Sequence, residues 1–177
     1  MARDPSVAEQ ISQKAVINEV NAPTAPAIGA KDGQVSVVVF SDFQCPYCRA
    51  LDLMLRNEVL AKVGDIATVR FRNLPLESHR WARDAALIGG CVAKQGDALF
   101  WRFAHDVFQK QEEIFSAGQP PDELEALVKG LSGVSVIGFQ QCRTLNQSES
   151  MIETDAEVAA TNSVAEAPTI FGKAGAP

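Results

Sequence analysis

The sequence predicts an α/β fold that carries an inserted α-helical domain. Three observations indicate this fold. Two strand-like runs flank a helical pattern, helical patterns then occupy most of the remaining chain, and a proline-led strand follows them. A chain of 177 residues, 46% of them apolar, can bury one sizeable core and is short for two independent domains.

A helix and a linker are expected over residues 1–30. Residues 5–14 carry the helical spacing, and prolines and a glycine make the rest of this segment irregular. Residues 35–40 then form a nearly continuous β-branched run that is apolar on both faces. Such a run is typical of a central strand that is covered on both sides.

A second helix and a second strand are expected next. Leu51, Leu55 and Val59 fall on one helical face, and Gly64 is a natural stop for that helix. Residues 68–72 alternate between apolar and polar side chains. We expect them to return in parallel beside the first strand and to complete a right-handed βαβ unit.

Residues 78–162 have the pattern of an inserted helical domain. Ser78 is expected to cap its first helix, Pro120 to open a later one and Ser135 to begin a shorter one. Glu149 leads the last helix, where the helix dipole favours an acidic residue. Side chains expected in the core recur at helical spacing: Trp81, Ala85, Ile88, Val92, Phe100, Trp101, Phe103, Val107, Phe108, Leu124, Leu127, Val128, Ile152, Ala156 and Ala159.

The chain returns to the sheet near its C-terminus. Residues 167–171 predict a short strand that begins with a proline. We therefore expect one α/β domain built from residues 31–77 and 163–177, which the helical domain interrupts.

The charge and the N-terminus limit the classes of partner and location. The net charge of −6 supplies no basic stripe for phosphates, so we expect no nucleic-acid partner. No apolar run approaches the roughly 20 residues that span a bilayer. Residues 1–5 lack the apolar region of a signal peptide. This fits a cytoplasmic protein, and also an exported one whose signal was replaced by a start methionine.

The motif Cys45-Pro46-Tyr47-Cys48 lies between the first strand and the helix. Two residues between cysteines at a helix start bring both sulfurs within one turn, close enough for a disulfide. The helix N-terminus stabilises a thiolate, so we expect Cys45 to be exposed and to act as the nucleophile. Cys48 is expected to be more buried and to resolve the mixed disulfide. Pro46 suits the first helical turn.

Other interpretations of the cysteine pair have less support. A structural zinc site would need a second CxxC or two spaced histidines, whereas His79 and His105 lie far apart. We therefore expect no metal and no cofactor, and assign both histidines to structural or exposed positions. Two unrelated structural thiols, or a binding module that holds a soft ion such as Cu(I), are the alternatives.

The segment from Val37 to Arg49 resembles the DsbA-like branch of the thioredoxin superfamily. So do residues 71–76, the segment from His79 to Cys91, and the strand at 167–171. The resemblance implies a thioredoxin-like fold and an enzyme, a periplasmic or otherwise exported protein disulfide oxidoreductase. It also implies client proteins that carry thiols or disulfides, and a redox partner protein that can be membrane-bound.

By the same resemblance, Cys45 is the nucleophile, Cys48 the resolving thiol, and Pro168 a cis-proline that faces them after Ala167. Cys91 and Cys142 have two interpretations, a structural disulfide between two helices or a pair of buried free thiols. The oxidising context of the family favours the disulfide.

The sequence departs from this family in three ways. Val39 stands where many relatives carry a buried glutamate, so Cys48 lacks the usual proton acceptor, and Asp42 is interpreted as a turn residue rather than a substitute. Ala167 replaces a residue that is commonly β-branched, which admits bulkier or less specific substrates. Relatives also continue with another strand and a helix, which predicts either a truncated chain or self-association that completes the sheet.

The dipeptide Pro46-Tyr47 also occurs in glutaredoxins, which lack the helical insertion. It leaves the direction of the reaction open between oxidation, reduction and isomerisation of client disulfides. A glutaredoxin-like or reductase role is therefore an alternative.

Overall fold

The computed structural model describes residues 24–174. Four strands in this part of the chain form a mixed sheet with the order β1–β3–β2–β4. β2 (Val35–Ser41) and β3 (Ala67–Asn73) pair in parallel, as the sequence predicts. β1 (Ala27–Gly29) is antiparallel to β3, and β4 (Thr169–Ala174) is antiparallel to β2. The α/β fold class is confirmed, and the helix expected at residues 5–14 lies outside the described residues.

β1 lies in the segment that was expected to be an irregular linker. Three residues are too few to show a strand periodicity, and hydrogen bonds to β3 hold the segment in place. Gly29 ends the strand with a φ of +94°, and a Cβ there would lie 2.2 Å from the carbonyl oxygen of Ala67. Only glycine therefore allows this edge strand to approach β3 so closely.

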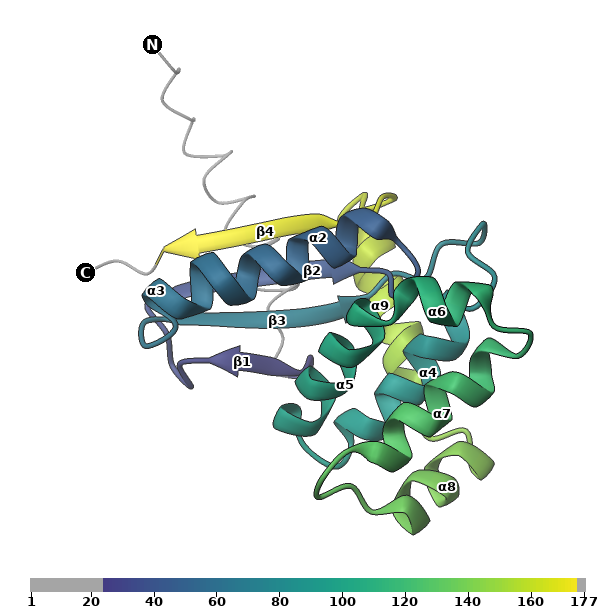
Figure 1. Cartoon of the computed structure of the whole chain (residues 1–177). Coiled ribbons are helices and arrows are strands. Elements are labelled where there is room, and N and C mark those ends of the chain that lie inside the picture. Colours follow the sequence, from purple (N-terminus) through teal and green to yellow (C-terminus); the bar gives the residue numbers. More distant parts are fainter. Residues whose placement is uncertain (1–23, 175–177) are drawn as a thin grey trace.

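The helix that follows β2 begins at the cysteine motif and crosses the sheet (Figure 1). It consists of α2 (Pro46–Met54), a π-helical stretch at Leu55–Leu60 and α3 (Ala61–Val63). Gly64 follows the last helical residue, so the predicted stop is confirmed. This continuous segment covers one face of the sheet and connects the two parallel strands.

The helical insertion lies toward the carboxyl ends of β2 and β3 (Figure 1). Its helices are α4 (Ala82–Ala93), α5 (Asp97–Gln109), α6 (Gln111–Ser116), α7 (Pro120–Gly130), α8 (Val136–Thr144) and α9 (Glu149–Thr161). Ser78 does not cap the first of them, because α4 begins only after Trp81. The preceding residues form a turn in which the His79 N–H donates to the carbonyl of Leu76.

The two faces of β2 bury different side chains, as the strand alternation predicts. Val39 belongs to the large core that α2 shares with the insertion. Val38 and Phe40 face the other side and pack against Val158 of α9. The aromatic residues expected in the core are buried there: Trp81, Phe100, Trp101 and Phe103.

Of the three α9 residues expected in the core, Ile152 and Ala159 are buried as predicted, and the prediction for Ala156 is wrong. Ala156 is exposed, and Asp155 takes the inward position instead. Its carboxylate accepts hydrogen bonds from the Arg72 guanidinium at 2.7 Å and from the backbone and side-chain N–H groups of Asn73 at 2.8 and 2.9 Å. Burial raises the pKa of the Asp155 carboxyl, and these donors oppose the rise.

Cys91 and Cys142 form a disulfide that joins α4 to α8 inside the insertion. Both side chains are buried in the large core, and their Cα atoms lie 5.7 Å apart. The bond links residues separated by 51 positions, and closing a loop of this length restricts the unfolded chain. It therefore fixes the far side of the insertion relative to α4.

We expect Asp155→Ala to lower the free energy of unfolding by about 3–5 kcal/mol, because it leaves the buried Arg72 guanidinium without its carboxylate. Urea titration measures this loss. Glu149→Ala on the same helix removes a partly exposed pair with Arg83 and is the matched control. It should cost no more than about 1 kcal/mol. Equal losses in the two variants would contradict the assignment.

We also expect Cys91 and Cys142 to resist alkylation in the oxidised protein, even after unfolding, because both sulfurs are joined in a disulfide and neither carries a free thiol. Digestion without reductant, followed by mass mapping, should recover the two peptides linked. Recovery of both residues as alkylated thiols would show that the bond is absent.

Candidate active site

The cysteine motif opens α2 directly after β2, as the sequence predicts. Cys45 is the N-cap residue, with an extended backbone, and Pro46 occupies the first helical position. The Cys45 N–H donates to the carbonyl of Asp42 at 3.1 Å, and the Arg49 N–H donates to the Cys45 carbonyl at 3.2 Å. The first sulfur therefore lies at the end of the helix, where backbone N–H groups face outward.

Both sulfurs are free thiols, and both side chains are buried. The expectation that Cys45 is exposed is wrong, since only 4% of its surface is accessible. Its thiol points toward the carbonyl oxygen of Ala167, at 3.4 Å, and this contact covers it. By contrast, Tyr47 is 74% exposed and projects into solvent.

The loop before β4 closes over the cysteine pair. The peptide bond between Ala167 and Pro168 is cis, and the Ala167 carbonyl accepts the hydrogen bond from the Cys45 thiol. The fold thus brings together two segments that lie 122 residues apart in the sequence. Ala167 and Pro168 are half-buried, and the Ala167 carbonyl faces the Cys45 sulfur.

The environment of Cys48 favours its protonated form. Burial raises the pKa of the Cys48 thiol to about 12, and the nearby Cys45 adds to the rise. Hydrogen bonds from the Ser41 side chain and from the Asp42 backbone act in the opposite direction. The Asp42 N–H lies 3.3 Å from the Cys48 sulfur. Cys48 therefore holds its proton through neutral pH.

Asp42 organises the loops around the motif, in agreement with its interpretation as a turn residue. One carboxylate oxygen accepts from the Gln44 N–H at 2.6 Å, which closes a turn over the motif. The other accepts from the Leu76 N–H and pairs with Nδ1 of His79, both at 2.8 Å. His79 is therefore structural. His105 pairs in a similar way with Asp52, at 3.2 Å.

Two glutamines support the motif without any signal in the sequence. Gln111 is buried in α6, and its amide donates to the carbonyls of Phe43 at 2.9 Å and Cys45 at 3.0 Å. Gln44 accepts from the Trp81 N–H at 2.9 Å. These hydrogen bonds depend on how the insertion packs onto the motif. The spacing of residues along the chain does not predict that packing.

An open groove of about 400 Å³ runs beside Pro46 toward α6. It is lined by Gln44, Pro46, Gln111, Glu112, Phe115 and Ser116. Phe115 is exposed, with the Arg80 guanidinium 5.3 Å from the centre of its ring. The groove therefore offers apolar and charged contacts next to the first cysteine.

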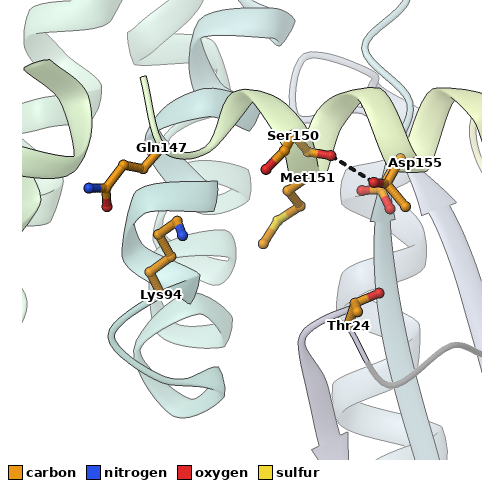
Figure 2. Close-up of a pocket in the computed structure, with 7 residues that line it drawn as sticks. Thr24, Lys94, Gln147, Ser150, Met151 and Asp155 are labelled. Carbon is orange, nitrogen blue, oxygen red and sulfur yellow. Dashed lines mark hydrogen bonds between the residues drawn. The ribbon is translucent and has the colours of Figure 1, made fainter. Parts of the chain in front are cut away.

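A second hollow, of about 310 Å³, lies between α4 and α9 (Figure 2). Figure 2 shows Lys94, Gln147, Ser150 and Met151 around it, with the Asp155 carboxylate at one end. That carboxylate is already engaged by Arg72 and Asn73. No cysteine lines this hollow, so we assign it no part in the site.

Within residues 24–174, no three histidine, cysteine or acidic side chains cluster in a way that could hold a metal ion. No helix in the same part of the chain is long and apolar enough to cross a membrane.

Comparisons with known proteins agree with this geometry. A family model described as Thioredoxin matches residues 21–173. Disulfide bond formation protein D of Bacillus subtilis is 25% identical over 147 residues, which cover 82% of this chain and 66% of that protein. The Na(+)/H(+) antiporter NhaA 1 of Mycolicibacterium vanbaalenii is 31% identical over 147 residues, which cover 81% of this chain and 22% of the antiporter.

Solved structures with a similar fold agree with the family match as well. The crystal structure of oxidised BdbD from Bacillus subtilis matches with a TM-score of 0.72 at 24% identity, and the match covers 85% of this chain and 82% of that one. The chain spans just under two thirds of the length of the Bacillus subtilis relative and about a fifth of the antiporter. With its sheet order, its cysteine motif and its helical insertion, the chain agrees with the matching family model and belongs to the thioredoxin family.

Proposed function

We propose that the chain is a protein thiol–disulfide oxidoreductase that exchanges disulfides with client proteins through Cys45 and Cys48. The observation that carries this proposal is the position of the Cys45 thiol. It lies at the N-terminus of α2 and faces the Ala167 carbonyl beside the cis peptide bond. Cys48, one helical turn further on, is close enough to close a disulfide with it.

The two cysteines have different roles in this mechanism. When a client disulfide is reduced, the Cys45 thiolate attacks one client sulfur, and the other leaves as a thiolate that takes up a proton. Cys48 then loses its proton and attacks the Cys45 sulfur, which releases the second client thiol and leaves a Cys45–Cys48 disulfide. Oxidation of a client dithiol is the reverse. The raised pKa of the Cys48 thiol and its position one turn inside α2 support its assignment as the resolving thiol.

The surroundings of the motif support a client in extended conformation. Ala167 presents backbone next to Cys45, and an extended peptide can pair with such backbone as an added strand does. The groove beside Pro46 offers Phe115 for an apolar client side chain, and the exposed carboxylate of Glu112, which pairs with Arg49 at 2.8 Å, for a basic one. The small side chain of Ala167 leaves room for bulky residues near the scissile disulfide.

We infer an exported, oxidising location, since a structural disulfide such as Cys91–Cys142 persists in such compartments. The direction of exchange depends on the reduction potential of the Cys45–Cys48 pair relative to its compartment and to a redox partner protein. Equilibration with glutathione buffers measures that potential. Self-association through the outer edge of β4 stays a prediction.

Cys45→Ser should abolish both reduction of insulin and oxidation of a dithiol peptide, because no nucleophile then faces the client. Cys48→Ser should accumulate mixed disulfides on Cys45, because the resolving sulfur is missing. Electrophoresis without reductant and intact-mass measurement detect these adducts.

The control for this pair is the double variant Cys91→Ala, Cys142→Ala, which removes two cysteines that lie outside the motif. It should keep its exchange activity at temperatures where it stays folded. Equal trapping of clients by the Cys45 and Cys48 variants would show that the roles are assigned wrongly.

A further inference from the structure

Resolution requires Cys48 to lose its proton, and the groups that contact its sulfur are poor acceptors. They are the Ser41 side chain and the Asp42 backbone N–H. The strand beneath offers Val39, which cannot accept a proton. The carboxylate of Asp42 is directed toward Gln44, Leu76 and His79, and Asp42 does not line the space beside Cys48. A proton acceptor must therefore be sought beyond these contacts.

A small cavity of about 10 Å³ adjoins Cys48. Its lining includes Val39 and Ser41 of β2, Cys48 and Asp52 of α2, and Trp101 of α5. Asp52 is the single carboxylate among the described residues that line it. The volume is close to the smallest that accommodates one water molecule, about 10–15 Å³. Polar groups of Ser41, Cys48 and Asp52 can supply the hydrogen bonds that such a water needs.

Asp52 lies one helical turn after Cys48, so both side chains share one face of α2. Its side chain is 3% exposed. Nε of Arg56 donates to both carboxylate oxygens at 3.0 Å, and Nδ1 of His105 lies 3.2 Å from one of them. The side chain of His105 is 36% exposed. Asp52 thus connects the cavity beside Cys48 to a titratable group at the surface.

We propose that Asp52 accepts the Cys48 proton through a water molecule in this cavity and exchanges it with solvent through His105. This inference rests on the proposed function and names the proton route of its second step. Charged or titratable groups face both ends of the route. Arg56 and His105 face the Asp52 carboxylate, and Cys45 faces Cys48.

The step balances as follows. The Cys48 thiol gives its proton to the water, and the water gives a proton to the Asp52 carboxylate. The Cys48 sulfur forms a bond to the Cys45 sulfur while the bond between Cys45 and the client breaks. The electron pair of that bond leaves with the client sulfur. In the oxidising direction Asp52 returns the proton to Cys48 as it leaves.

The experiment measures two rates from pH 6 to pH 10, attack of the reduced protein on oxidised glutathione and release of the mixed disulfide by Cys48. Asp52→Asn should slow release at pH 7 by roughly tenfold or more, the lower end of what a positioned acid or base contributes. Attack by Cys45 should change less than about twofold. The deficit should shrink as the pH rises, because the Cys48 thiol then ionises directly.

Two further variants separate a proton route from a structural effect. Glu58→Gln neutralises an exposed carboxylate that pairs with Lys62 and does not line the cavity, so release should match the wild type. Val39→Glu in the Asp52→Asn background places a carboxylate on the other wall of the cavity and should restore most of the rate at pH 7. If Asp52→Asn does not fold, His105→Gln replaces it and should slow release in the same pH-dependent way.

Release by Asp52→Asn that equals the wild type across the pH range would overturn the inference. Slowing that is independent of pH, or equal slowing of attack and release, would overturn it too. Failure of the wild-type chain to form any mixed disulfide would instead refute the proposed function.

Discussion

The carboxylate of Asp42 joins the end of the central strand to the loop that leads into the insertion. Its oxygens fix Gln44 just before the cysteine motif, and Leu76 and His79 just before α4. Its own backbone contacts both cysteines, through its carbonyl to Cys45 and its N–H to Cys48. Burying a carboxylate without hydrogen-bond donors costs folding free energy. The N–H groups of the two loops stabilise the Asp42 carboxylate, and the carboxylate in turn holds these loops in place. The position of both sulfurs depends on this junction.

The insertion also forms part of the site. Phe43, between Asp42 and the motif, stacks on Phe71 at 5.1 Å and contacts Phe100, Phe103 and Phe108 of α5. The Gln111 amide in α6 then donates to the carbonyls of Phe43 and of Cys45 in the motif. Because the disulfide fixes α4 to α8 within the same core, a disturbance of the insertion would reach the cysteines through packed side chains.

Local patterns were sufficient to predict the parallel strands, the helix start at the motif and most of the inserted helices. The failures occur where a distant partner decides the outcome. Asp155, and not Ala156, faces inward from α9, because Arg72 and Asn73 of β3 donate hydrogen bonds to its carboxylate. Cys45 is covered by a carbonyl 122 residues away. The strand β1 is too short to carry a period and exists through its pairing with β3. The spacing of residues in a single sequence does not predict these contacts between distant segments.

The same reasoning explains why an acid near Cys48 belongs on the helix in this chain. A carboxylate at position 39 would extend from β2 into the apolar core that contains Phe43, Phe71 and Leu51. Burying a charge there costs several kcal/mol of folding free energy. At position 52 the carboxylate reaches the same small cavity, yet it is bound by Arg56 and His105 near the surface of α5. The helix therefore supplies a charged group next to the buried thiol together with the partners that stabilise it, which the strand does not.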